Sequence, residues 1–322
     1  MVTKQWLRDA PAVTGPRQGI YPAMRRIARD ALALGVGSTL PTNMRYLEEH
    51  GIVAGTMQRA LAALETSGAL VVTSRGHLGR VIDGLDVGAA WQASGLPPIR
   101  LLFPPSGPPE VDTLSTLISE QLTAHRLPHT VHHARGGIGR LRATQQGEHD
   151  FALVSRGVLT QALEPDEAEA VPVRIFGPGT YYAPETLVVV TRDTQDPSSV
   201  RTVAIDEESY DHVAFTRAEF PPQEGFRYVP CPFTKVPAMV LRGEVEAGIW
   251  HRTATFVPLE LTGLSVRQLH RPAAVSAWEA LSPAVIVACP IRSELASVLE
   301  ILNLVDLASR QRAALTRGWE EG

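Results

Sequence analysis

The stretch GIVAGTMQRAL, residues 51–61, decides the fold of the first part of the chain. Its first glycine stops one helix, and a second helix follows over about 56–66 with its apolar residues on one face. A shorter helix, over 41–50, precedes the glycine. A short helix, a tight turn and a second helix are typical of a helix-turn-helix, whose second helix begins in the DNA major groove.

Further elements extend this motif on both sides. The spacing of apolar residues predicts a helix from Tyr21 to Leu34, and two short strands follow the motif, over Ala69–Ser74 and Arg80–Asp83. A loop that contains two glycines joins the strands. Three helices and a hairpin outline a winged helix-turn-helix, which we predict for residues 19–84, after a flexible arm over 1–18.

The second helix and the wing supply the residues that we expect to contact DNA. The amide of Gln58, near the start of that helix, can pair bidentately with adenine. Polar and basic side chains on the helices and the wing would fix position through phosphates. The predicted DNA-binding residues are Thr42, Asn43, Arg45, Thr56, Gln58, Arg59, Arg75, His77 and Arg80.

This part of the chain resembles the GntR superfamily of bacterial regulators. The residues that match its register are Leu40, Pro41, Thr42, Gly51, Thr56, Ala60, Leu61 and Leu64. A closer resemblance, to the YhfZ-type branch, covers about 45 residues and rests on three segments. They are Gly55-Thr56-Met57-Gln58-Arg59-Ala60-Leu61, Gly68-Ala69 and Arg75-Gly76-His77-Leu78-Gly79. The resemblance implies a DNA-binding head and a C-terminal domain similar to periplasmic solute-binding proteins.

The chain departs from the wider superfamily at two positions that usually contact DNA. Many GntR members carry arginines where Met44 and Ala54 stand here. The operator sequence is therefore not inherited from the resemblance, and we expect the wing and the arm to contribute more to affinity.

The charge divides unevenly along the chain. Residues 1–96 carry 10 Lys/Arg and 7 Asp/Glu, a net +3, whereas the remaining residues carry 20 and 27, a net −7. A basic head on an acidic body indicates two tasks, DNA binding and the binding of something small. Because +3 is a thin electrostatic footprint, we expect operator binding to need a dimer, and a protein-interaction module stays the alternative for the head.

Beyond a predicted linker over 85–98, in which a short helix is expected around Ala89–Gln92, strand-length apolar runs alternate with helical patterns. This alternation is typical of βαβ units and mainly parallel sheets. A long helix over about 291–317, with Leu295, Leu299, Leu302 and Val305 on one apolar stripe, is expected to end the chain. The predicted fold is α/β, an N-terminal winged helix-turn-helix plus a two-lobed domain over 99–322 similar to type 2 periplasmic-binding proteins.

Strand-to-helix junctions in the body predict the effector site. Ligands of such folds lie at the carboxyl ends of strands, where helix N-termini and loop amides converge, an arrangement that suits an anion. Arg156 is the expected charged partner of that anion, and the aromatic residues are expected to stack or to line the site. The predicted effector-binding residues are Ser106, Gly107, Gly136, Gly137, Ser155, Arg156, Tyr181, Tyr182, Thr234 and Trp250.

Several function classes receive no support from the sequence. There is no HExxH, GxSxG, P-loop or GxGxxG motif, so we predict no catalytic residue, metal or cofactor. Lysine occurs only at Lys4 and Lys235, which excludes the GntR branch whose body needs a Schiff-base lysine. Cys231 and Cys289 are expected to be buried thiols, and the longest apolar run, over 284–289, is too short for a membrane span. We therefore expect a cytoplasmic protein.

These observations predict a transcriptional regulator that responds to a ligand. We expect a homodimer that binds double-stranded operator DNA, and a small, anionic effector that closes the two lobes and changes operator affinity. The alternatives are an enzyme of solute-binding fold, a lyase or transferase with an interaction module at its N-terminus, and a structural dimer adaptor.

Overall fold

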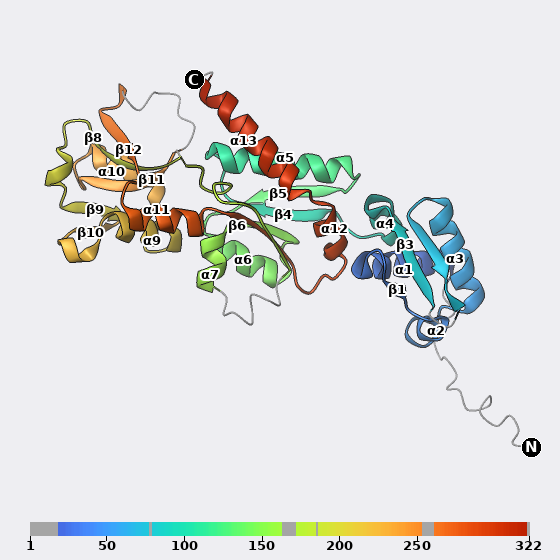
Figure 1. Cartoon of the computed structure of the whole chain (residues 1–322). Coiled ribbons are helices and arrows are strands. Elements are labelled where there is room, and N and C mark those ends of the chain that lie inside the picture. Colours follow the sequence, from blue (N-terminus) through green and yellow to red (C-terminus); the bar gives the residue numbers. More distant parts are fainter. Residues whose placement is uncertain (1–18, 77–78, 163–171, 185, 253–260, 321–322) are drawn as a thin grey trace, which may run out of the picture. The chain divides into compact units, whose positions relative to one another are not determined.

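The computed structural model describes residues 19–76, 79–162, 172–184, 186–252 and 261–320 (Figure 1). The chain forms two compact units. We call the first the head; it comprises residues 1–98, 125–127 and 293–301. We call the second the body; it comprises residues 99–124, 128–292 and 302–322. The expected arm over 1–18 and the wing residue His77 lie outside the described residues.

The head is a winged helix-turn-helix. Its elements are α1 (Ile20–Leu34), β1 (Thr39–Leu40), α2 (Asn43–His50), α3 (Ala54–Thr66), β2 (Leu70–Ser74), β3 (Arg80–Leu85), α4 (Val87–Ser94) and α12 (Leu295–Ile301). The strands form an antiparallel sheet in the order β1-β3-β2. Thr42 caps α2 by accepting a hydrogen bond from the Arg45 amide, and Gly51 ends it in the left-handed conformation at φ 65°. The fold of the head is therefore as predicted, although α3 begins at Ala54, two residues earlier than expected.

The segment that we expected to be a linker, over 85–98, contains a docked helix. Asp86 caps α4 by accepting from the Ala89 amide, and Trp91 of α4 is fully buried. A Cβ atom on Gly88 would lie 1.9 Å from the carbonyl oxygen of His125, so only glycine allows this approach. The short helix that we expected around 89–92 is present as α4, and close packing at Gly88 docks it within the head instead of leaving it in a free linker.

The expected long final helix is two helices. Asn303 starts α13 (Leu304–Glu320) because its side-chain oxygen accepts from the Asp306 amide, 3.1 Å away. The preceding helix, α12, belongs to the head, where the Ser297 hydroxyl donates to the carbonyl of Leu32 at 2.6 Å. Val305, which we placed on the apolar stripe of a single helix, is 81% exposed, so the break changes which face is buried.

The body has two lobes, each built on a five-stranded sheet. Lobe I has the strand order β5-β4-β6-β13-β7 and lobe II the order β10-β9-β11-β8-β12. Lobe I consists of β4 (Ile99–Phe103), α5 (Pro109–Ala124), β5 (His129–His133), α6 (Gly137–Gln145), β6 (Phe151–Ser155), α7 (Arg156–Ala162), β7 (Val173–Ile175), β13 (Ala284–Ala288) and α13. Lobe II consists of β8 (Leu187–Arg192), η2 (Pro197–Ser199), β9 (Thr202–Ile205), α9 (Tyr210–Glu219), η3 (Pro222–Glu224), β10 (Arg227–Pro230), η4 (Phe233–Lys235), α10 (Val236–Leu241), β11 (Ala247–His251), β12 (Leu264–Gln268) and α11 (Pro272–Leu281).

The two sheets share one topology. In each, three parallel strands stand in the order second-first-third, and an antiparallel strand, β13 or β8, pairs with the third. Because β13 follows lobe II in the chain and returns to lobe I, the chain crosses between the lobes twice. This is the architecture of type 2 periplasmic-binding proteins, as predicted.

Helices cover both faces of each sheet. In lobe I, α5 and α13 lie on one face, and α6 and α7 lie on the other (Figure 1). The apolar strands β6 and β13 are buried along their whole length between these layers, as expected for the centre of such a sheet. No helix among the residues with described positions is long and apolar enough to cross a membrane.

Candidate DNA-binding surface and inter-lobe site

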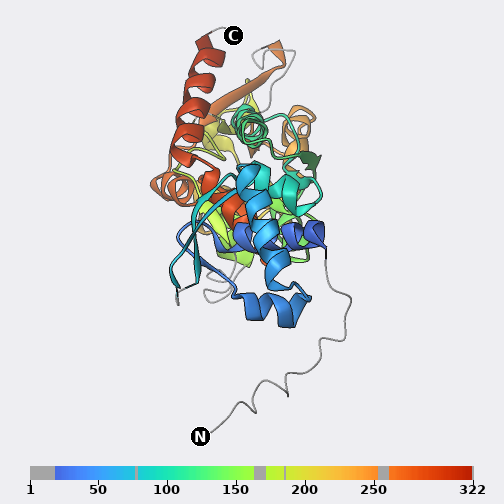
Figure 2. The ribbon, with the colours of Figure 1, turned by 90° about the vertical axis from the view of Figure 1, so that its right-hand side faces the viewer.

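The helix α3 presents two of the predicted DNA-binding side chains to solvent. Gln58 and Arg59 are exposed near its start, and Arg59 rests on its own helix by donating from Nε to the Gly55 carbonyl at 3.2 Å. Within the head, Figure 2 shows α3 rising from the turn after α2, with the β2–β3 hairpin to the left of α3. The prediction for Thr56 is wrong, because its side chain is only 5% exposed and faces the core of the head.

The start of α2 and the wing are joined by a hydrogen bond between two predicted residues. Arg80 of β3 donates from Nη1 to Oδ1 of Asn43 at 2.8 Å. The backbone amide of Arg75 donates to the Gly79 carbonyl at 2.8 Å. The side chain of Arg75 is exposed. Asn43 and Arg80 therefore form one polar surface with the exposed cap residue Thr42.

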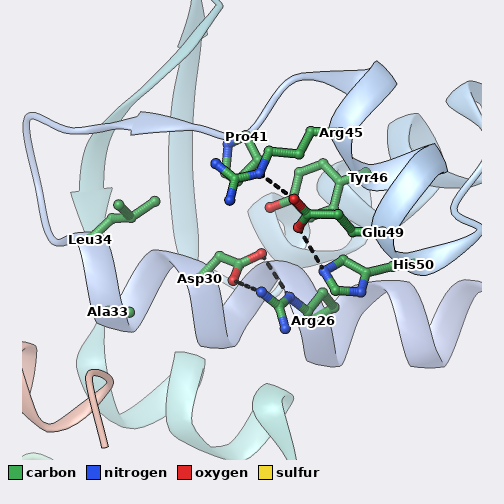
Figure 3. A pocket seen from close by; sticks show the side chains of 9 residues that line it. All are labelled: Arg26, Asp30, Ala33, Leu34, Pro41, Arg45, Tyr46, Glu49 and His50. Carbon is green, nitrogen blue, oxygen red and sulfur yellow. Dashed lines mark hydrogen bonds and ion pairs between the residues drawn. The ribbon is translucent and has the colours of Figure 1, made fainter. Parts of the chain in front are cut away.

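A hollow of about 180 Å³ lies between α1 and α2, and ion pairs surround it (Figure 3). Arg45 pairs with Glu49 at 2.7 Å, and the hydrogen bond from this guanidinium lowers the pKa of the Glu49 carboxyl. Arg26 pairs with Asp30 at 2.8 Å on the opposite wall. The side chain of Arg45 is 64% exposed, so it can exchange Glu49 for a phosphate.

In the body, the first of two buried acids is Glu110, the second residue of α5 in lobe I. Its side chain is fully buried, and its Oε1 accepts from Nε2 of His251 at 2.7 Å, at the end of β11 in lobe II. The same oxygen accepts from the Ala183 amide at 3.0 Å and from the hydroxyl of Thr186, both in the first crossing segment. Burial opposes ionisation of Glu110, but His251, Thr186 and the Ala183 amide outweigh it and lower the pKa of this carboxyl.

The second buried acid, Asp211, is the second residue of α9 in lobe II. Its Oδ2 accepts from the hydroxyl of Ser155 at 2.5 Å, at the end of β6 in lobe I, and from the hydroxyl of Tyr182 at 2.8 Å. Burial raises the pKa of Asp211, against the opposing effects of these two hydrogen bonds and of the positive charge of Arg140. Ser155 and Tyr182, both predicted effector residues, thus bind a carboxylate of the chain itself.

Tyr182 contacts the surroundings of both Glu110 and Asp211, which together with their hydrogen-bond partners we call the two acid clusters. Its ring packs edge-on against His251 at a centroid distance of 5.0 Å, while its hydroxyl bonds to Asp211. The neighbouring Tyr181 is buried, and its hydroxyl accepts from Nη2 of Arg140 at 2.9 Å. We expected both tyrosines to line the effector site; the structure places both in polar contacts at the boundary between the lobes.

Two further junctions that we predicted from the sequence are brought together at this boundary. Arg135, at the junction before α6, donates from Nη2 to the hydroxyl of Thr234 in lobe II at 2.6 Å. Its guanidinium also lies 6.0 Å from the centre of the Phe233 ring. Thr234 is exposed, so this contact is at the surface of the boundary rather than within it.

Other predicted effector residues have different roles. Trp250 is 6% exposed in the hydrophobic core of lobe II, so its assignment is wrong; the next residue on the strand, His251, is the one that meets Glu110. The amide of Gly107 donates to Asp112 of α5, the helix that follows it, at 2.9 Å. A Cβ atom on Gly137 would lie 2.3 Å from a methyl group of Val158, so packing explains this glycine.

Three predicted effector residues have open surroundings. Arg156 and Ser106 are exposed, and a Cβ atom on Gly136 would meet nothing within 4 Å. None of the three is in hydrogen-bond contact with the acid clusters in the described part of the chain.

Sequence reasoning missed Glu110, Asp211 and Arg140. An acidic residue in the first turn of a helix is common because it complements the helix dipole, so neither acid was a signal by itself. Glu110 and Asp211 occupy equivalent positions, because each is the second residue of the helix that follows the first parallel strand of its lobe. This repeated position is the signal by which the sequence could have identified them.

Comparisons with known proteins cover both units. The profile of the YhfZ C-terminal domain family matches residues 86–321, and the profile of a helix-turn-helix domain matches residues 35–82. A protein named YhfZ from Escherichia coli strain K12 is 25% identical over 243 residues, 74% of this chain and 78% of that protein.

Two solved structures are similar to the chain. The crystal structure of YhfZ from Shigella flexneri superposes with a TM-score of 0.53 at 18% identity, and covers 72% of this chain and 96% of that one. The periplasmic aliphatic sulphonate binding protein SsuA from Escherichia coli has a TM-score of 0.48 at 15% identity, with coverage of 69% and 70%.

Proposed function

Because the chain belongs to the YhfZ family, we propose that it is a transcriptional regulator of GntR type whose operator binding responds to a small effector. It combines a helix-turn-helix domain with a two-lobed domain of the periplasmic-binding-protein type. The observation that carries the proposal is that α3 leaves Gln58 and Arg59 exposed, with the joined pair Asn43–Arg80 on the same motif.

The DNA contacts divide into two classes. Gln58 reads a base edge, and the residues that contact phosphates are Thr42, Asn43, Arg45, Arg59, Arg75 and Arg80. We leave His77 in the second class and remove Thr56, whose side chain is buried.

Fluorescence anisotropy with a duplex from the region upstream of the gene tests DNA binding. Affinity should fall linearly with the logarithm of salt concentration, and Arg59→Ala should weaken binding and reduce the slope by about 1. Gln58→Ala should cost about 1–3 kcal/mol and relax the preference at one base pair. Arg312→Ala removes the same charge from an exposed site on α13 of the body and is the matched control. Binding without a salt slope, or equal losses in Arg59→Ala and Arg312→Ala, would contradict the proposal.

The effector site is proposed for the boundary between the lobes. The support is that Ser155, Tyr181 and Tyr182 gather there with buried charges from both lobes, and that exposed Arg156 begins α7 directly after Ser155. Thermal unfolding of the full chain with a panel of small carboxylates and phosphates tests this. Arg156→Ala should reduce the shift in unfolding temperature, whereas Arg142→Ala, an exposed arginine on α6, should not.

We propose a homodimer in the cytoplasm as the active form. Helix-turn-helix proteins usually bind two half-sites, and a second copy doubles the +3 net charge of residues 1–96. Light scattering of the chain with and without duplex measures this, and a monomer bound to one duplex would contradict it.

The second candidate, an enzyme of solute-binding fold, is tested in the same preparations. Turnover of a metabolite without retention on DNA favours the enzyme; retention on DNA without turnover favours the regulator.

A further inference from the structure

The contacts of Asp211 resemble those of a ligand rather than those of a structural ion pair. Both groups that hold its Oδ2 are neutral hydroxyls, from Ser155 of lobe I and Tyr182 of the crossing segment. Ser155 is 1% exposed and stands at the carboxyl end of β6, where ligands of α/β sheets bind. The Asp211 side chain enters this position from the other lobe.

The second carboxylate oxygen fills a space that is shaped for it. Oδ1 of Asp211 is buried and has no hydrogen-bond partner among the described residues. A Cβ atom on Gly157 would lie 2.0 Å from Oδ1, and 3.1 Å from Cδ2 of Leu281. A glycine at 157 thus makes room for this carboxylate oxygen.

The buried guanidinium of Arg140 lies close to this site. Arg140 is 3% exposed and donates to the Tyr181 hydroxyl, and to the carbonyls of Leu153 and Ala134 at 3.0 and 2.8 Å. Its charge favours an anion at the Asp211 position without pairing with that anion directly.

From this arrangement we infer that Ser155, Tyr182 and Gly157 form a carboxylate-binding site that Asp211 occupies from lobe II, and that the effector is a carboxylic acid which competes with Asp211. This deepens the proposed function and rests on it. An effector carboxylate bonded to Ser155 and Tyr182 deprives Asp211 of both hydrogen bonds, and α9 is released from the end of β6. The effector therefore acts on the boundary by exchanging with an internal carboxylate.

Chemical rescue of Asp211→Ala tests the inference. The variant empties the position of its carboxylate, so acetate and formate should raise its unfolding temperature by several degrees more than chloride, phosphate or neutral acetamide. The wild type, and Asp193→Ala at an exposed site of the same lobe, should respond equally to acetate and chloride. A second change, Ser155→Ala in the Asp211→Ala chain, should weaken acetate binding about tenfold, the loss of one hydrogen bond to a charged group.

If Asp211→Ala is too unstable for a thermal unfolding measurement, refolding of the variant from urea in each salt tests the same inference. Recovery of folded variant in acetate but not in chloride supports the inference, and so does a selective rise in unfolding temperature. Equal responses to acetate, chloride and acetamide, or failure to refold in all three, overturn it. Salt-dependent DNA binding by the wild type is measured separately, so loss of rescue with retained DNA binding refutes only this site.

Discussion

Glu110 and Asp211 occupy the same position in the two lobes but have different partners. Each is buried, is the second residue of the helix after its lobe's first parallel strand, and reaches across the boundary. Glu110 meets His251, a backbone amide and a hydroxyl, whereas Asp211 meets two hydroxyls. The pKa of Glu110 is lowered, and the pKa of Asp211 is raised.

From this difference we infer that Glu110 holds the two lobes together at their boundary, whereas Asp211 can be replaced there by the carboxylate of an effector. Glu110 accepts hydrogen bonds from His251, the Ala183 amide and Thr186, and removing one member of such a buried pair leaves its partner buried without a hydrogen bond. Asp211 depends on two hydroxyls, which can also donate to another carboxylate.

The largest expected effect is that of Glu110→Ala. It leaves His251 and the Ala183 amide buried without a partner, so the free energy of unfolding should fall by about 3–5 kcal/mol in urea titrations. Glu120→Ala, on the same helix, breaks the exposed pair with Arg310 and should cost at most about 1 kcal/mol. Similar losses in the two variants would show that Glu110 does not hold the boundary.

Gly157→Ala should have the next largest effect, because the new methyl group meets Oδ1 of Asp211. We expect a loss of about 1–3 kcal/mol, and a smaller loss when Asp211 is also Ala, since the obstructing carboxylate is then gone. Gly139→Ala, in α6 with nothing within 4 Å of its Cβ position, should be neutral or should stabilise by up to about 1 kcal/mol. Additive losses in the Gly157/Asp211 double variant would contradict the contact.

The two acids should affect the pH dependence of stability with opposite signs. A lowered pKa means that the contribution of Glu110 is present above its unfolded pKa and is lost as pH falls through the folded value. A raised pKa means that Asp211 costs stability as pH rises from its ordinary value of 3.8 through the folded value.

Urea titrations of Glu110→Gln and Asp211→Asn across this range measure the two signs. Relative to wild type, Glu110→Gln should become less stable as pH rises, and Asp211→Asn more stable. The change should be about 1.4 kcal/mol for every tenfold difference between the acid's dissociation constants in the folded and unfolded chains. Curves that change in the same direction would remove the distinction between the acids.

The smallest expected effect at the boundary is that of Thr234→Ala. This change removes one exposed hydrogen bond, from Arg135, so stability should change by less than about 1 kcal/mol. A loss as large as that of Gly157→Ala would mean that the surface contact, not the buried acids, joins the lobes.

The sequence predicted the head well because its signals are local. Thr42 caps α2 and Gly51 ends it within ten residues, and each position has its own conformational requirement. The docking of α4 was missed because it depends on the meeting of Gly88 with His125, 37 positions further along the chain.

The body was predicted at the level of its fold and only in part at the level of its site. Alternating strands and helices indicate the lobes, and the strand ends indicate Ser155 and its neighbours. The partners of those residues are distant in sequence: Glu110 and His251 are 141 positions apart, and Ser155 and Asp211 are 56 apart. Trp250 and His251 are adjacent on one strand and point to opposite faces, and the sequence did not show which one faces the boundary.

Operator affinity of Asp211→Ala against wild type, at one salt concentration, tests most directly whether the boundary controls DNA binding. If release of Asp211 is the signal, the dissociation constants should differ at least fivefold, or by about 1 kcal/mol of coupling, while both proteins keep the same salt slope. Equal dissociation constants, with acetate bound by the variant, would contradict the account.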